Sequence, residues 1–173
     1  TLDFQVGRTN KAFGANSFYT ATYPNQFEET KTTFASLKFE SGTKVHLIPS
    51  VYWRRHQDRF ELFRTEPASW YKGHNYHLTD VFGSNLNVWF ASRFGKTAFG
   101  AEIRTENVWS NVLGEALTTP IQVPGEDNQF FTKSYSRTTI SYFAEHSINL
   151  EKFSLSAGAM TNWISDLGFG WNI

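Results

Sequence analysis

The feature that most constrains the fold of this chain is an alternation of apolar and polar residues with a period of two. Between residues 97 and 106 the odd positions are mainly apolar, whereas Glu102, Arg104 and Glu106 occupy even positions. Successive side chains of a β-strand point to opposite faces of a sheet, so this period predicts strands with one apolar and one polar face. The same argument predicts seven strands in all, over or near residues 2–9, 32–40, 44–63, 82–90, 97–106, 136–149 and 153–160.

The predicted strand at residues 44–63 contains Pro49. Proline has no backbone N–H to donate to a ladder and normally occupies a bulge, an edge or a strand start. We therefore expect a local irregularity of the sheet at this residue.

The connections between the predicted strands alternate in length. Three tight turns and three long loops are expected, at residues 41–43, 94–96 and 150–152 and at residues 10–30, 64–78 and 112–135 respectively. Short turns on one side of a sheet and long loops on the other are typical of outer-membrane barrels. The predicted fold class is therefore all-β, an antiparallel up-and-down transmembrane β-barrel.

The aromatic residues fit a chain with a lipid-facing surface. They make up 17% of the chain, although its mean hydropathy is only −0.42. Trp53, Trp109 and Trp163 lie near the long-loop ends of predicted strands, and Phe94 and Phe153 near the tight turns, as two aromatic girdles require. In the alternative interpretation they are core residues of a soluble lipocalin-like barrel or β-sandwich, because hydropathy does not reveal which face points outward.

Charge and cysteine content narrow the classes of function. Lys plus Arg and Asp plus Glu each total 16, so the chain has no basic field to hold a nucleic-acid backbone. The absence of cysteine removes disulfides, thiolate metal sites and cysteine nucleophiles. Because basic and acidic residues balance, nucleic acid is not an expected partner. A transmembrane helix is not expected either, since no apolar run approaches the roughly 18 residues that it needs.

No arrangement of titratable residues indicates catalysis, a cofactor or a metal site. His74 and His77 stand close together, but no further His or Cys completes a set of metal ligands. Glu102 and Arg104 share a strand face, and Glu145 lies on a neighbouring strand, so we predict that these three residues face a water-filled lumen. Because no nucleophile elbow or phosphate-binding glycine loop occurs, we predict that the chain is not an enzyme.

The long loops hold the residues best suited to bind a ligand. Aromatic rings stack on flat ligands, and arginine and asparagine can bond to polar groups. The predicted ligand-binding residues are Phe13, Tyr19, Tyr23, Arg64, Trp70, Tyr71 and Asn75. The charged stretch at residues 53–59 has two interpretations, a lumen or rim surface that receives a ligand or plug, and a solvated extension of the barrel wall.

Residues 10–19, 23–28, 52–64 and 99–104 resemble barrel segments of TonB-dependent outer-membrane receptors, in particular the cobalamin-transporter-like members. The resemblance extends over nearly the whole chain. It implies a 22-stranded barrel with an N-terminal plug domain in the outer membrane of a Gram-negative bacterium. It also implies transport of a scarce small-molecule cargo, first a corrinoid such as cobalamin, with energy delivered through TonB. The implied partners include outer-membrane lipid and a surface lipoprotein.

The chain departs from this family in three ways. No plug domain or TonB-contacting segment is visible, seven strands cannot close such a barrel, and residues 171–173 are expected to lie in a loop. We therefore interpret residues 1–173 as part of a single barrel domain of a larger receptor, whose plug domain lies outside this chain. Two alternatives stay open: a small structural or adhesive outer-membrane barrel, and a soluble ligand-binding β-protein.

Overall fold

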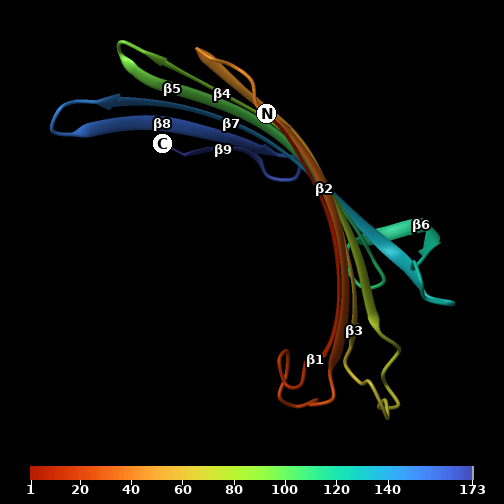
Figure 1. Ribbon diagram of the computed structural model, residues 1–173. Helices are drawn as coiled ribbons and strands as arrows, with labels where there is room; N and C mark the ends of the chain where they lie inside the picture. The colour runs from red at the N-terminus through yellow and green to blue at the C-terminus, as the bar shows by residue number, and fades with distance from the viewer. Residues whose placement is uncertain (173) are drawn as a thin grey trace.

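The fold is a single curved antiparallel sheet (Figure 1). The computed structural model describes residues 1–172, of which none is helical, and 71% of the chain is strand. The nine strands are β1 (Leu2–Gly14), β2 (Phe27–Phe39), β3 (Val45–Glu61), β4 (Asn75–Ser92), β5 (Gly95–Ser110), β6 (Glu115–Gln122), β7 (Phe130–Asn149), β8 (Ser154–Ile164) and β9 (Gly168–Asn172). Each strand pairs with the next in the chain, except that β5 pairs with β7 and β6 lies off the main path. The all-β, antiparallel, up-and-down prediction is confirmed, and the sheet is open, not closed into a barrel.

The predicted number of seven strands is wrong. β6 lies inside the segment expected to be a loop at residues 112–135, and β9 includes Trp171 and Asn172, which were expected in a terminal loop. The third residue of that segment, Ile173, lies outside the described residues. β6 escapes detection because it pairs with β7 only at its two ends, with a register shift between Ala116 and Ile121. An interrupted strand shows no sustained alternation.

The first two long loops are shorter than predicted. β1 and β2 pair as far as Gly14 and Phe27, which leaves a loop at residues 15–26, and the β3–β4 loop spans residues 62–74. The added strand residues include Lys11, Glu28 and Glu29, which are polar on both faces of the sheet. A strand that is polar on both faces carries no hydropathy signal of its period.

The irregularity expected at Pro49 is confirmed. The ladder between β2 and β3 runs to the pair Lys38 and Ser50 and resumes only at the isolated bridge between Ser41 and Leu47. On the other side of β3, Pro49 stays in regular register with Leu86. The missing N–H of proline accounts for the gap in the β2–β3 ladder.

The position of β6 identifies the two faces of the sheet. β6 and its loop lie on the convex side (Figure 1), where Gln57 Nε2 donates a hydrogen bond to the Pro124 carbonyl (2.9 Å). Side chains alternate along a strand, so odd-numbered β3 residues such as Trp53 face the convex side. Even-numbered β3 residues such as Tyr52 face the concave side.

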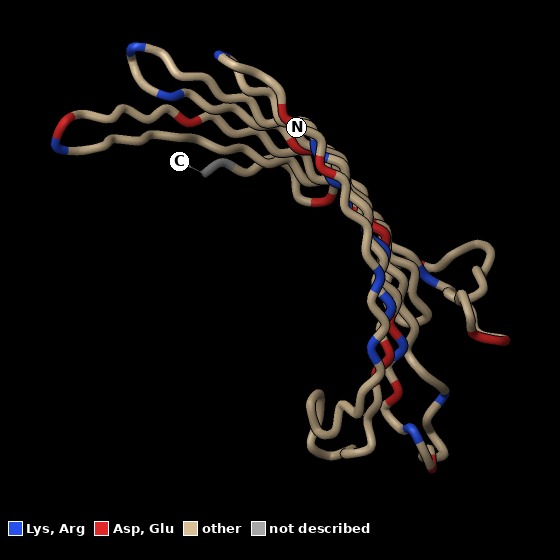
Figure 2. The backbone as a smooth tube through the Cα atoms, in the orientation of Figure 1, with Lys and Arg blue, Asp and Glu red and all other residues tan. Residues whose placement is uncertain are grey.

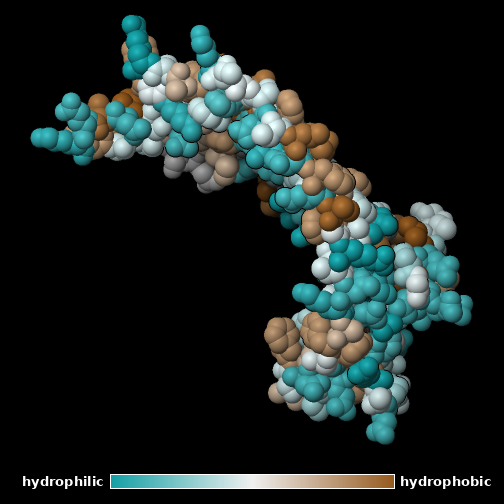
Figure 3. Space-filling view, viewed as in Figure 1, coloured by the Kyte–Doolittle hydropathy of each residue, from teal (hydrophilic) through white to brown (hydrophobic). Residues whose placement is uncertain are grey.

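An apolar band crosses the convex face. Residues that pair in register across neighbouring strands lie on the same face of the sheet. Leu86 pairs with Pro49 of β3, and Ala101 pairs with Leu86, so both lie on the convex face. Large members of the band that are at least 41% exposed include Leu2, Phe4, Val6, Leu37, Val51, Leu86, Phe99, Ile103 and Leu155. Figure 3 shows hydrophobic side chains along the upper half of the sheet, and mainly hydrophilic ones where the strands continue towards the long loops.

The concave face is polar at the same level. Ser50 Oγ donates to Asn85 Oδ1 (2.8 Å), and Tyr52 Oη donates to a carboxylate oxygen of Glu102 (2.9 Å). Figure 2 shows many of the charged residues along the lower half of the sheet, which leads to the long loops, and others at the tips of the hairpins. At this level the alternation therefore separates an apolar convex surface from a more polar concave one, on which Phe34 and Phe143 also lie.

Three glycines on the concave face lie under aromatic rings of the neighbouring strand. The register pairs are Gly7 with Phe34, Gly83 with Tyr52 and Gly100 with Phe143. A Cβ added at any of these glycines would overlap the partner ring. Glycine thus lets each ring lie across the adjacent backbone, an arrangement that also supports sheet curvature.

We expect Gly83→Ala to lower the free energy of unfolding by about 1–3 kcal/mol, because the added methyl group overpacks against Tyr52. Urea unfolding measures the change. The control is Gly170→Ala, since an added Cβ there meets no atom of residues 1–172 within 4 Å. Equal effects of the two substitutions would contradict the packing role of Gly83.

The one hydrophobic core cluster of the described residues lies beneath β6. It consists of Tyr76, Leu78, Val123 and Phe131, with Trp109 packed against it. Val123 and Phe131 are at most 1% exposed. Trp109, predicted as a girdle residue, therefore helps to hold the β6 segment on the sheet. For this tryptophan the structure agrees with the alternative interpretation of a core aromatic.

Candidate functional site

The long loops bring three of the predicted ligand-binding residues into one aromatic group. We call Tyr23, Phe63, Trp70 and Tyr71 the loop cluster. The Phe63 ring lies 5.1 Å from Tyr23, 5.6 Å from Trp70 and 5.3 Å from Tyr71 between centroids, each in an edge-to-face arrangement. Phe63, which the sequence analysis did not single out, is therefore the centre of the cluster. Only Trp70, at 55% exposed, keeps most of its ring open to a ligand.

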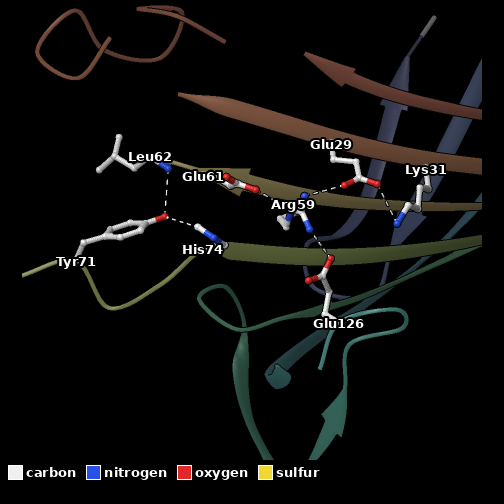
Figure 4. Close-up of polar contacts among 8 residues, drawn as sticks. All are labelled: Glu29, Lys31, Arg59, Glu61, Leu62, Tyr71, His74 and Glu126. Carbon is white, nitrogen blue, oxygen red and sulfur yellow. Dashed lines mark hydrogen bonds and ion pairs between the residues drawn. The ribbon is translucent and has the colours of Figure 1, made fainter. Parts of the chain in front are cut away.

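Polar contacts fix the base of the loop cluster (Figure 4). Tyr71 Oη accepts a hydrogen bond from the Leu62 amide (3.2 Å) and bonds His74 Nδ1 (3.0 Å). Burial raises the pKa of Tyr71 above its ordinary value. Asn111 ties the same loop to β5, because its side-chain amide donates to the His74 carbonyl (2.8 Å). Tyr71 and His74 thus position the loop.

Three more of the predicted ligand-binding residues, Phe13, Tyr19 and Asn75, lie on the concave face at the loop end, together with Glu28 and Phe60. The register aligns Phe13, Glu28, Phe60 and Asn75 in one row across β1 to β4. Tyr19 folds onto this row from the β1–β2 loop, with Oη donating to Glu28 Oε2 (2.6 Å) and its ring 4.8 Å from Phe60. We call these five residues the ledge. The hydrogen bond to Glu28 raises the pKa of Tyr19 to about 12, so its hydroxyl stays protonated.

The β1–β2 loop is shaped from within by a buried glutamine. Gln26 is 1% exposed and donates to the carbonyls of Thr20 (3.0 Å) and Tyr23 (2.8 Å). The Tyr19 amide donates to Gln26 Oε1 (3.3 Å). Gln26 therefore places Tyr19 on the ledge and Tyr23 in the loop cluster. Nothing in the spacing of residues 15–26 signals this role.

Arg64 joins neither group. Its guanidinium lies 4.0 Å from the centroid of the buried Phe27 ring, and its amide donates to the Asn25 carbonyl (3.2 Å). The structure therefore gives the Arg64 side chain a cation–π contact at the base of the β1–β2 loop.

The charged stretch at residues 53–59 divides between the two faces. On the convex face, Arg55 makes two hydrogen bonds to Asp80 (2.8 and 2.6 Å), a carboxylate that is only 3% exposed as a residue. The concave face receives the even-numbered side chains of this stretch, Arg54, His56 and Asp58, because side chains alternate along a strand. Thr32 Oγ1 bonds His56 Nδ1 there (2.7 Å).

Arg59 is the hub of an ionic cluster on the convex face (Figure 4). Its guanidinium lies 2.9 Å from Glu29, 3.0 Å from Glu61 and 2.7 Å from Glu126. Burial disfavours the charge, but the carboxylates outweigh this effect and raise the pKa of Arg59. Because Glu126 belongs to the β6–β7 loop, Arg59 ties that loop to the sheet.

The three predicted lumen residues lie on the concave face, but they do not form one site. Glu102 accepts the bond from Tyr52, and Arg104 Nε lies 3.8 Å from Glu106. Glu145 pairs in register with Ala98, four residues from Glu102 along β5. Glu102 and Arg104 border a hollow of about 420 Å³ whose lining combines amide and hydroxyl side chains with Phe143 and Met160. The arrangement provides a wall of mixed polarity.

Within residues 1–172, no group of three or more His, Asp or Glu side chains is placed to hold a metal ion. His74, considered above as a ligand, lies in the β3–β4 loop and bonds Tyr71 Oη, whereas His77 lies on β4 in register with Asp58. The described residues also lack a helix with the length and apolar character needed to cross a membrane.

Comparisons with known proteins do not assign the chain to a family. No protein-family model matches the chain, and neither a curated protein nor a solved structure is significantly similar to it.

Proposed function

We propose that this chain is part of the wall of a transmembrane β-barrel in the outer membrane of a Gram-negative bacterium. The observation that carries the proposal is the apolar band, which continues across the convex face while the concave face at the same level is polar. Contiguous exposed apolar surfaces of this kind are rare on soluble monomers, but they match the lipid-facing band of a barrel.

The open edges support a larger barrel. The outer edge of β1 has no partner strand among the described residues, and neither has that of β9. Unpaired backbone groups in hydrocarbon cost several kcal/mol each, so strands outside this sheet would complete the wall. The 22-stranded receptors that the sequence resembles are large enough to include such a segment.

The proposed activity is TonB-dependent uptake of a scarce nutrient, without catalysis. The loop cluster and the ledge present aromatic and polar groups where the long loops meet the concave face, and a solute entering the lumen passes this level. A corrinoid is the first candidate cargo, because it combines a flat ring with amide side chains. The plug domain that contacts TonB would lie outside this chain, and a surface lipoprotein would be an added partner.

The two faces can be tested with spin labels in the full-length protein in lipid vesicles. We expect a label at Ala101 to be reached by a lipid-soluble quencher, whereas a label at Ala98 on the same strand responds to a water-soluble one. The chain has no cysteine of its own, so each engineered cysteine in it gives a single label position. If neither label senses lipid, the soluble ligand-binding alternative replaces the barrel.

A further inference from the structure

The half-buried carboxylate of Asp58 lies beside the ledge and accepts no hydrogen bond from a described residue. Asp58 occupies the next row of the concave face, in register with Thr30 and His77. In the described part of the chain no group donates a hydrogen bond to it, although burial raises its pKa to about 6. A carboxylate that loses hydration without gaining a donor favours a ligand that supplies one.

The aromatic side chains near Asp58 are open to solvent. Phe13 is 44% exposed, Tyr19 57% and Phe18, which packs on Tyr19 at 4.9 Å between centroids, 79%. Figure 3 shows a separate group of hydrophobic side chains at this end of the molecule. The rings provide flat apolar area, and the carboxylates of Glu28 and Asp58 in the adjacent rows are hydrogen-bond acceptors.

Charge limits the class of ligand. The ledge row and the row of Asp58 contain two carboxylates, Glu28 and Asp58, and one cation, Lys11. Tyr19 occupies only one oxygen of Glu28, so the other oxygen and both oxygens of Asp58 remain acceptors. An anionic solute would meet repulsion here, and an uncharged donor would not.

We propose that the ledge and Asp58 form a binding surface for an uncharged, amide-rich solute, whose flat part covers the exposed rings and whose N–H groups donate to the two carboxylates. The inference rests on the proposed function, since it requires the concave face to line a solute pathway. It deepens that function by excluding anionic cargo.

The test is equilibrium binding of cyanocobalamin to the full-length protein. We expect Asp58→Asn to weaken binding about tenfold, the usual loss for a charge-assisted hydrogen bond. The substitution keeps the shape of the side chain and removes a poorly solvated charge, so it does not destabilise the fold. The matched control is Asp127→Asn in the exposed β6–β7 loop, which should leave binding unchanged.

The pH dependence gives a second readout. Ligand donors favour the ionised form of Asp58, so binding should strengthen as pH rises through about 6, and Asp58→Asn should remove most of that dependence. His56 favours the ionised carboxylate and Glu28 opposes it, while Tyr19, His77 and Lys11 also carry titratable groups on this face. The residual pH dependence of the Asp58→Asn variant reports their contribution.

Three outcomes separate this inference from the corrinoid proposal. If the protein binds cyanocobalamin and Asp58→Asn binds it equally well, the inference is overturned and the transport proposal stands. If it binds a neutral ferric hydroxamate peptide in an Asp58-dependent way but no corrinoid, the inference stands and the corrinoid cargo is wrong. If it prefers a trianionic ferric tris-catecholate, the assigned charge class is wrong.

Discussion

Replacing Ala101 with arginine should lower the free energy of unfolding of the full-length protein in lipid by about 2–4 kcal/mol. Ala101 lies in the middle of the apolar band, between Leu86 of β4 and Tyr142 of β7. On the proposed lipid face, an arginine near the bilayer midplane must hold its charge in hydrocarbon or deform the membrane. Urea unfolding in vesicles measures the loss.

The matched control for this substitution is Ala98→Arg. Ala98 lies on the same strand with its side chain on the concave face, in register with Glu145, which can pair with the new charge. We expect this variant to lose less than about 1 kcal/mol. Gly100 is unsuitable as the control, because the ring of Phe143 occupies the space above it. Equal losses for the Ala98 and Ala101 variants would remove the distinction between a lipid face and a lumen face.

The strand positions were predictable from sequence where one face of the sheet is apolar and the other polar. Along β5, Ile103 and Arg104 differ so strongly in hydropathy that the period is visible without a structure. Farther towards the loops this contrast fails, because Asp58 and Arg59 are both charged although they face opposite sides of the sheet. Hydropathy can place a strand, but it does not show how far a solvated strand continues.

The candidate site was only partly predictable, for a related reason. Aromatic residues in the loops were recognised by type, but which rings meet depends on strand register. Tyr19 reaches Phe60, 41 residues later in the chain, because β2 and β3 align Glu28 with Phe60. Once that register is known, Glu28, Phe60 and Asp58 follow from alternation, whereas Phe63 is identified only by the folded shape of two loops.

The second large effect is expected from Arg59. Arg59→Ala would leave Glu29, Glu61 and Glu126 close together without their shared cation, and each is at most a quarter exposed in its side chain. Removing one partner of a buried ion pair costs about 3–5 kcal/mol, and because this cluster is only partly buried we expect the lower end of that range. Because Glu126 belongs to the β6–β7 loop, we expect the segment at residues 111–129 to detach first from the sheet.

Limited proteolysis of the full-length protein measures this detachment, with cleavage within residues 111–129 expected to accelerate in Arg59→Ala. Arg59→Lys keeps the charge but cannot reproduce the three-way contact, so its effect should be smaller. In Glu126→Gln the carboxylate partner in the loop is neutral while Arg59 still neutralises Glu29 and Glu61, so cleavage should rise moderately. If Arg59→Ala leaves the segment as resistant as the unchanged protein, the hydrophobic core of Val123 and Phe131 holds β6 in place without the ionic cluster.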